Sequence, residues 1–169
     1  MQARMKNPAA LLTEVPGEWE LVAGFLLRGR ADRIERRRDG TISILDYKTG
    51  RVPPQKEVED GRAPQLPLEA AMAEAGAFGN LHGTVDELAY WKLTGRSEPG
   101  NVCTLFKRDA ARVADVVRLA SDKLRDLIAL FDNPETPYLA QPHPGLAPTR
   151  SDYAQLARVA EWAAARDEE

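Results

Sequence analysis

The sequence predicts a mixed fold of the α/β or α+β class, with a small mixed β-sheet flanked by helices. Three observations predict it. The first half carries short runs of β-branched and apolar residues bounded by turn residues, a helical segment lies between two sets of such runs, and a long amphipathic helical pattern follows. At 169 residues, with 43% apolar and 29% charged residues, the chain is long enough for one domain with a core.

The first third of the chain predicts strands joined by short connections. Residues 1–18 carry several Pro and Gly residues, so we expect irregular structure there, with a short helical turn around residues 9–13. Strands are predicted at residues 19–23, 26–36 and 41–48. Arg38-Asp39-Gly40 contains residues that favour a turn, and it separates the second predicted strand from the third. Residues 51–63 contain two adjacent prolines and mixed charge, which predicts a surface loop.

The rest of the chain predicts a helix, two strands and two further helices. Residues 64–75 predict a helix, with Gly76 at the position of a C-terminal cap. An antiparallel pair is expected from residues 85–93 and 102–106. Asp109 is placed to cap a long helix that ends near Phe131. One face of that helix is apolar and is expected to face the core; its members are Val113, Val116, Val117, Ala120, Leu124, Leu127, Ile128 and Phe131.

These elements predict a single domain that spans residues 1–169. Its core is expected to occupy about residues 19–131, followed by an extended Pro-rich segment at 132–150 and a final helix at 151–165. No apolar run approaches the roughly 18 residues that a membrane span needs, and the N-terminus lacks the core of a signal peptide. We therefore expect a cytoplasmic protein that does not bind a membrane. Cys103 is the only cysteine, so an internal disulfide, a cysteine-based zinc site and an iron–sulfur cluster held by four of the chain's own cysteines are not expected.

Basic residues are concentrated in one part of this acidic chain, whose net charge is -3. Residues 26–56 contain nine Lys and Arg residues and four Asp and Glu residues. A solvated strand edge would explain this composition, and so would a strip that binds phosphates. Two of the four acids, Asp32 and Asp46, are also the candidate metal ligands, which favours the phosphate-binding interpretation.

Asp32 and Asp46 lie on neighbouring predicted strands, fourteen residues apart, and Lys48 follows the second of them. Two carboxylates can hold a divalent cation, and a lysine can stabilise the negative charge that develops when a phosphodiester is cleaved. A simpler interpretation is that both aspartates are surface carboxylates paired with Arg30, Arg33 or Lys48.

The turn between the two strands decides whether the aspartates share a face. A two-residue turn at Asp39-Gly40 would pair Asp32 with Tyr47 and send Asp32 and Asp46 to opposite faces. A three-residue loop with Gly40 in the left-handed region would instead pair Asp32 with Asp46, with the β-carbons about 4.5–5.5 Å apart. Two like charges directly opposite each other destabilise a sheet unless a bound Mg²⁺ or Mn²⁺, or nearby arginines, neutralise them. On that basis we predict the three-residue loop, in which Asp32, Asp46 and Lys48 share one face.

Three segments together resemble a known family. They are Gly29-Arg30-Ala31-Asp32-Arg33-Ile34, Asp46-Tyr47-Lys48-Thr49-Gly50 and Pro64-Gln65-Leu66-Pro67-Leu68-Glu69. The chain is similar in these segments to the PD-(D/E)XK nucleases of the RecB type, the group that includes the nuclease domain of the AddB-type helicase–nucleases of double-strand break repair. The resemblance implies a restriction-endonuclease-like core, although the first helix of that core is expected to be missing here.

The resemblance also implies roles for individual residues. Asp32, Asp46 and the backbone carbonyl of Tyr47 would be ligands of Mg²⁺ or Mn²⁺. Lys48 would be catalytic, and Gln65 would be catalytic and contact DNA. Further DNA contacts are expected from arginines in the basic strip, namely Arg28, Arg30, Arg33 and Arg51.

The chain departs from the family pattern at three places. RecB-type sequences usually carry a Tyr where this chain has Glu69. The acidic or His ligand of the family's first helix has only Glu14 as a local substitute. No iron–sulfur cluster is expected, since relatives with a cluster need four cysteines.

The activity implied is metal-dependent hydrolysis of DNA, on single strands or duplex ends, in the bacterial cytoplasm and with a helicase–nuclease partner of the AddA type. Two other classes of function stay open. One is a DNA-binding or scaffold module that has the fold without catalysis. The other is an interaction domain that docks through the apolar face of the helix beginning after Asp109.

Overall fold

The computed structural model describes residues 8–22, 24–79, 81–95, 100–140, 142–146 and 156. The chain divides into two units, residues 1–128 and 129–169, each of which is described by itself. The β-sheet and all of the candidate site residues belong to the first unit.

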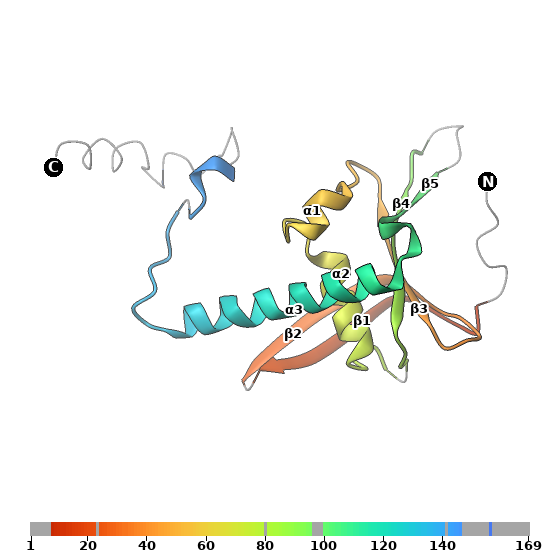
Figure 1. Cartoon of the computed structure of the whole chain (residues 1–169), viewed down its shortest axis with the longest axis horizontal. Helices are drawn as coiled ribbons and strands as arrows, with labels where there is room; N and C mark the ends of the chain where they lie inside the picture. Colours follow the sequence, from red (N-terminus) through yellow and green to blue (C-terminus); the bar gives the residue numbers. More distant parts are fainter. Residues whose placement is uncertain are drawn as a thin grey trace. The chain divides into compact units, whose positions relative to one another are not determined.

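The first unit is built on a mixed five-stranded sheet, which confirms the predicted fold class (Figure 1). The strands follow one another across the sheet in sequence order, and β3 and β4 are its parallel pair while the other neighbours are antiparallel. Their bounds are Ala10–Val22 (β1), Phe25–Arg36 (β2), Ile42–Lys48 (β3), Val85–Lys92 (β4) and Asn101–Thr104 (β5).

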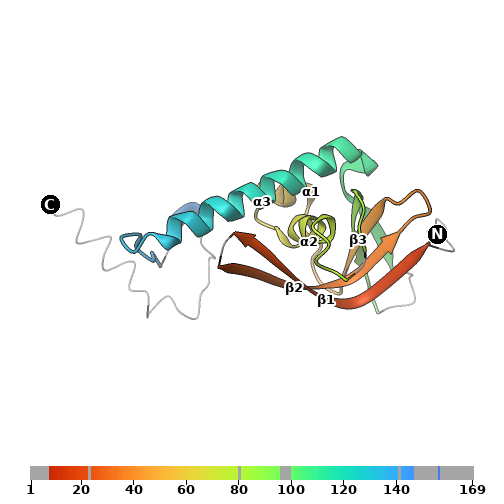
Figure 2. The ribbon, with the colours of Figure 1, turned by 90° about the horizontal axis from the view of Figure 1, so that it is seen from below.

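The connection between the parallel strands carries two helices, α1 (Gln55–Glu59) and α2 (Gln65–Glu74). A 3₁₀ turn (Leu105–Arg108) follows β5 and leads into the long helix α3 (Ala110–Asp132). The helices of the first unit lie over one face of the sheet, with α2 next to the strands (Figure 2). The main core forms between this face and the helices; its fully buried members include Ile34, Ile44, Leu66, Met72, Leu88 and Val113. In the second unit, a short 3₁₀ helix spans Pro144–Leu146.

Both helix caps predicted from the sequence are confirmed. The Asp109 Oδ1 atom accepts a hydrogen bond of 3.1 Å from the backbone N–H of Arg112, which satisfies one of the free donors at the start of α3. Gly76 has a φ of 77°. The amide of Gly76 donates to the carbonyl of Ala73, and that of Ala77 donates to the carbonyl of Met72. These two bonds form a Schellman motif, so the glycine ends α2 as expected.

The apolar face of α3 is partly a core face. Val113, Val116, Val117 and Ile128 are buried, whereas Leu127 is half exposed. The first half of this face therefore packs within the chain, as predicted. No helix in the described part of the chain is long and apolar enough to cross a membrane.

The expectation of irregular structure was wrong for residues 10–18, as was the helical turn expected at 9–13, because β1 begins at Ala10. Residues 1–7 lie outside the described part of the chain. The strand pairs with β2 along its length, and this tertiary pairing overrides the weak local preference. Glu14, with a φ of 50°, interrupts the strand geometry. Residues that pack against the core have even numbers before Glu14 and odd numbers after it, as Leu12 and Val15 show. The regular alternation that identifies a strand in a sequence is therefore broken.

Two further boundaries differ from the predictions. The predicted loop at 51–63 contains α1, a helix of one and a half turns that begins after Pro54 and buries Val58. The last predicted strand ends at Thr104 instead of continuing to Phe106, because Phe106 has a φ of 53° and turns the chain into α3. The helix predicted at 151–165 lies outside the described residues, apart from Leu156. The domain boundaries proposed from the sequence stay a prediction.

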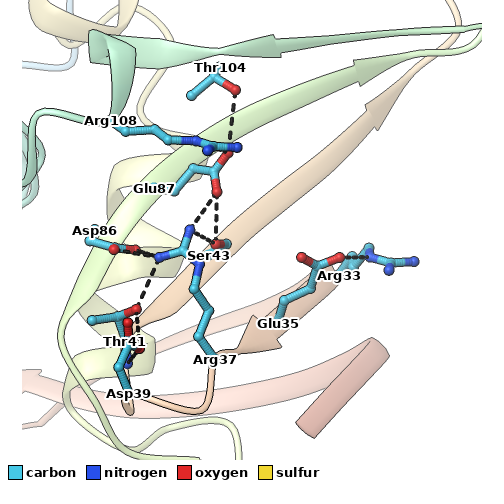
Figure 3. A network of polar contacts seen from close by, with 10 residues as sticks. All are labelled: Arg33, Glu35, Arg37, Asp39, Thr41, Ser43, Asp86, Glu87, Thr104 and Arg108. Atoms are coloured by element: carbon cyan, nitrogen blue, oxygen red, sulfur yellow. Dashed lines mark hydrogen bonds and ion pairs between the residues drawn. The ribbon is translucent and has the colours of Figure 1, made fainter. Parts of the chain in front are cut away.

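The sheet face turned away from the helices carries a network of buried and half-buried polar groups (Figure 3). Arg37 donates to Asp86, Glu87 and the Ser43 hydroxyl, and Glu87 and Ser43 are 2% and 1% exposed. Thr104 also donates to Glu87. Because these groups are hydrogen-bonded to one another, the polar side chains can stay buried on this face.

Candidate active site

The β2–β3 hairpin has the predicted three-residue loop. Ile34 pairs with Ile44, Gly40 has a φ of 88°, and the amide of Arg37 donates to the Thr41 carbonyl at 2.8 Å. This register confirms the prediction made from the Arg38-Asp39-Gly40 sequence. The same register determines which residues of β2 and β3 lie opposite each other at the end of the hairpin away from the loop, where Asp32 and Asp46 are found.

The hairpin ladder stops just before the two aspartates, at the pair formed by Arg33 and Leu45. Beyond that pair, the Asp32 Oδ2 atom accepts a hydrogen bond of 2.9 Å from the backbone N–H of Tyr47. A side-chain carboxylate thus replaces a ladder bond and ties the two strands together where they separate. This bond fixes Asp32 beside the strand that carries Asp46 and Lys48.

Asp46, Lys48 and Gln65 form a closed group at this end of β3. Lys48 Nζ lies 2.8 Å from Asp46 Oδ2 and 3.1 Å from Gln65 Oε1. Gln65 Nε2 donates to Asp46 Oδ1 at 2.7 Å. Asp46 and Lys48 are two residues apart on a strand, so they share a face, and Gln65 reaches them from the first turn of α2. Three of the residues singled out from the sequence therefore meet in space.

Glu69 belongs to the same group. It lies four residues after Gln65 on α2 and therefore on the same helix face. Its Oε1 atom accepts a hydrogen bond of 3.0 Å from Gln65 Nε2. Its Oε2 atom is buried and has no hydrogen-bond partner in the part of the chain that the structure describes.

The carboxylates of this group have raised pKa values. Burial raises the pKa of Asp46, and the neighbouring charge of Lys48 opposes this rise, while that of Asp32 adds to it. Burial raises the pKa of Glu69 to about 7, with smaller contributions from the charges of Asp46 and Asp32. Carboxyl groups that raise one another's pKa in a partly desolvated place are typical of functional sites.

Sequence reasoning missed Tyr90, which lies beneath the site. It is the register partner of Asp46 on the parallel strand β4, and 1% of its surface is exposed. Lys48 Nζ lies 5.9 Å from the centre of its ring. Tyr90 could have been placed beside Asp46 only if the parallel pairing of β3 with β4 had been known, because that pairing joins residues more than forty positions apart.

Other residues predicted for the site lie apart from this group. Glu14 is exposed and paired with Arg30 at 3.7 Å. Arg28 is paired with Glu18, also at the surface. A β-carbon built on Gly29 would lie 3.4 Å from the Met72 sulfur of α2, so the residues on either side of Gly29 face away from the helices.

The two remaining predicted arginines also have partners. Arg33 is bonded to Glu35 at 2.7 Å on the open face of the sheet, the face turned away from the helices (Figure 3). Its guanidinium also lies 6.0 Å from the centre of the Trp91 ring. Arg51, exposed in the loop after β3, pairs with Glu57.

The donor set at the site suits a hard divalent cation. Asp32 and Asp46 supply carboxylate oxygens, and Mg²⁺ commonly binds to one or two carboxylates, with water and substrate phosphate completing its ligands. Among the described residues, no group of three or more His, Cys, Asp or Glu side chains lies close enough to hold a metal ion. The site therefore suits a cation that takes its remaining ligands from water and from the substrate phosphate.

A pair of aspartates and a lysine at one end of a mixed sheet, with a glutamine supplied by the adjoining helix, defines a class of phosphodiester-cleaving fold. The chain belongs to the PD-(D/E)XK nuclease superfamily, whose family model matches residues 2–166. Members of this superfamily are generally nucleases and generally use divalent metal ions.

Curated relatives are found in Rickettsia. An uncharacterized protein of Rickettsia bellii is 40% identical over 101 residues, which cover 58% of this chain and 11% of that protein. An uncharacterized protein of Rickettsia typhi is 44% identical over 78 residues, which cover 44% of this chain and 9% of that protein. The chain spans about a tenth of the length of these relatives.

Among solved structures, the crystal structure of SSO0001 is similar to 68% of this chain and 50% of that chain, with 21% identity and a TM-score of 0.37. We base no argument on this likeness.

Proposed function

We propose that the chain is the nuclease domain of a DNA double-strand break repair protein of the RecB/AddB type, which hydrolyses DNA phosphodiester bonds with Mg²⁺ or Mn²⁺. The observation that carries the proposal is the joined group of Asp46, Lys48 and Gln65, with Asp32 tied to the same strand. Membership of the PD-(D/E)XK nuclease superfamily supports it.

Each residue of the group has a task that its position allows. Asp32, Asp46 and the Tyr47 carbonyl would hold the cation, which when bound lowers the pKa of a water molecule and neutralises phosphate charge. The ammonium group of the half-buried Lys48 lies beside Asp46 and Gln65, where it can stabilise negative charge developing on the phosphate. Gln65 holds both Asp46 and Lys48 through its carboxamide, and because it is exposed, it can also contact the strand.

DNA would reach the site from the side of Gln65 and Arg51. Both are exposed, and Arg51 can exchange its surface partner Glu57 for a phosphate at little cost. Arg28, Arg30 and Arg33 lie on the face of the sheet that is turned away from the helices. They would contact DNA only if the bound strand extended from the site around the edge of the sheet to that face. Binding through such contacts should weaken steeply with salt and show little sequence preference.

The test compares cleavage by the full chain with cleavage by Lys48→Met. The substrate is end-labelled DNA, single-stranded and duplex, with Mg²⁺, Mn²⁺ or EDTA. We expect metal-dependent cleavage that Lys48→Met lowers by about 100-fold or more, since the developing charge loses its stabilising cation. Lys56→Met, which removes an exposed lysine of α1, is the matched control and should cleave like the parent chain. Equal cleavage by Lys48→Met and the control would refute the proposal.

A second candidate function is a DNA-binding module of the same fold that does not cleave. The finding that favours it is the lack of a third metal-ligating side chain beside Asp32 and Asp46 in the described residues. In the same assay, this candidate predicts DNA that is bound but uncut under every metal condition. In either case, the domain would act on DNA in the bacterial cytoplasm, beside a helicase–nuclease partner of the AddA type.

A further inference from the structure

Glu69 is an unusual residue for its place in the fold. Only 6% of it is exposed, and its neighbours on the buried side of α2 are apolar; they are Leu66, Ala70, Met72 and Ala73. One of its two carboxylate oxygens has no hydrogen-bond partner among the described residues. A buried carboxylate with an unpaired oxygen lowers the stability of the folded chain. We therefore expect a functional reason for its presence.

Among the described residues, the hydrogen-bond partner of Glu69 is Gln65, which belongs to the candidate site. Gln65 Nε2 has two protons, of which one is donated to Glu69 Oε1 and the other to Asp46 Oδ1. Both protons of the carboxamide are therefore directed at negatively charged oxygens. The carbonyl side of the same carboxamide, Gln65 Oε1, is left to accept from Lys48 Nζ.

We propose that Glu69 is a positioning residue, whose carboxylate holds the Gln65 carboxamide with Nε2 toward Asp46 and Oε1 toward Lys48. This inference rests on the proposed nuclease function for its catalytic consequence, but the contact itself can be tested without activity. It gives a task to the position where this chain departs from the Tyr of RecB-type sequences.

The geometry explains why the contacts to β3 alone would not fix Gln65. Gln65 is exposed and its side chain has three rotatable bonds. Without Glu69, it would be held only by Asp46 and Lys48, which lie two residues apart on one strand, and one Nε2 proton would lose its acceptor. A second acceptor on the same helix, four residues away, fixes the plane of the group. Reversal of the carboxamide is also opposed, because it would place Oε1 against two carboxylates. With Glu69 in place, Lys48 is held between Asp46 and Gln65 rather than by Asp46 alone.

The contact is tested by NMR of the Gln65 side-chain amide at pH 8 in EDTA, with Gln65→Ala used to assign its two Nε2 protons. Glu69→Met keeps the length of the side chain and removes the acceptor. We expect it to shift one of the two proton resonances and to speed its exchange with water by about tenfold or more. Glu69→Gln keeps an acceptor oxygen and should restore the parent pattern. Unchanged resonances and exchange in Glu69→Met would overturn the proposal.

The consequence for the reaction is tested with the cleavage assay. Removing a partner that orients an active-site group typically costs 10- to 100-fold, so Glu69→Met should lower kcat about tenfold or more and leave KM for DNA unchanged. In a Gln65→Ala background, the same substitution should have no further effect, because Glu69 acts only through Gln65. Equal losses in both backgrounds would contradict the positioning role. If the parent chain does not cleave DNA, the proposed function fails, while the NMR result still decides whether Glu69 holds Gln65.

Discussion

Replacing Glu69 with glutamine is expected to stabilise the folded chain at neutral and alkaline pH. The substitution preserves the shape of the side chain and an acceptor for Gln65, and it removes a charge that is buried with one oxygen unpaired. Most substitutions of buried residues destabilise a protein. A gain in stability would therefore indicate that the Glu69 charge is kept for function and not for folding.

The magnitude follows from the pKa of Glu69, which is about 7 in the folded chain against an ordinary value of 4.5. A difference of about 2.5 corresponds to about 3 kcal/mol, at 1.36 kcal/mol for each pKa unit. Because the folded-state pKa is raised, the unfolded chain loses this proton first. The destabilising effect is therefore absent below about pH 4.5, grows as the pH rises and is fully present above about pH 7.

The assay is urea unfolding of the parent chain and Glu69→Gln in EDTA at several pH values between 5 and 8.5, followed by circular dichroism. The difference in unfolding free energy should grow by about 2 kcal/mol across this range, in favour of the variant. Glu18→Gln, at a surface ion pair with Arg28, is the matched control and should show little change. A variant that is less stable than the parent at pH 8 would refute the reasoning, because it would mean that the Glu69 charge is stabilised in the fold.

Two further predictions concern the fold. Gly17→Ala should lower the free energy of unfolding by about 1–3 kcal/mol, since a β-carbon there would lie 2.5 Å from the Phe78 ring. A β-carbon on Gly50 would meet no atom within 4 Å, so Gly50→Ala is the control and should change the free energy of unfolding little. Equal losses in the two variants, measured by urea unfolding, would contradict the packing argument. Arg37→Met removes one of two guanidinium groups in the described part of the chain that pair with the buried Glu87, the other being that of Arg108 at 3.4 Å, and should cost about 1–3 kcal/mol. A thermal unfolding midpoint within a degree of the parent value would refute this role for Arg37.

The part of the fold that could be predicted depends on local signals. The three-residue loop follows from Arg38-Asp39-Gly40, because only a glycine adopts the left-handed geometry there at no cost. The ends of α2 and α3 follow from Gly76 and Asp109, whose backbone and side-chain bonds are those of standard caps. Each of these features is decided by residues close together in the sequence.

The features that could not be predicted depend on distant contacts. The first half of β1 is a strand only because β2 lies beside it, and the break at Glu14 hides its alternation. The alternation changes phase in β2 as well, since Ala31 and Ile34 are both buried in the core although they are three residues apart. This change turns Arg28 and Arg30 away from the site that their sequence position suggested. The proposed role of Glu69 depends on Gln65, four residues earlier on the same helix face, and on Asp46, more than twenty residues earlier. The first spacing is local, but the contact of Gln65 with Asp46 is not.

The central claim is that Asp46 belongs to a metal-dependent nuclease site, and Asp46→Asn tests it most directly. The substitution keeps the size of the side chain and removes the charge that would hold the cation. We predict that the parent chain cleaves end-labelled DNA with Mg²⁺ or Mn²⁺ and not with EDTA, and that Asp46→Asn abolishes cleavage while Asp60→Asn, at an exposed ion pair, retains it. Cleavage that persists in Asp46→Asn, or that continues in EDTA, would contradict the account.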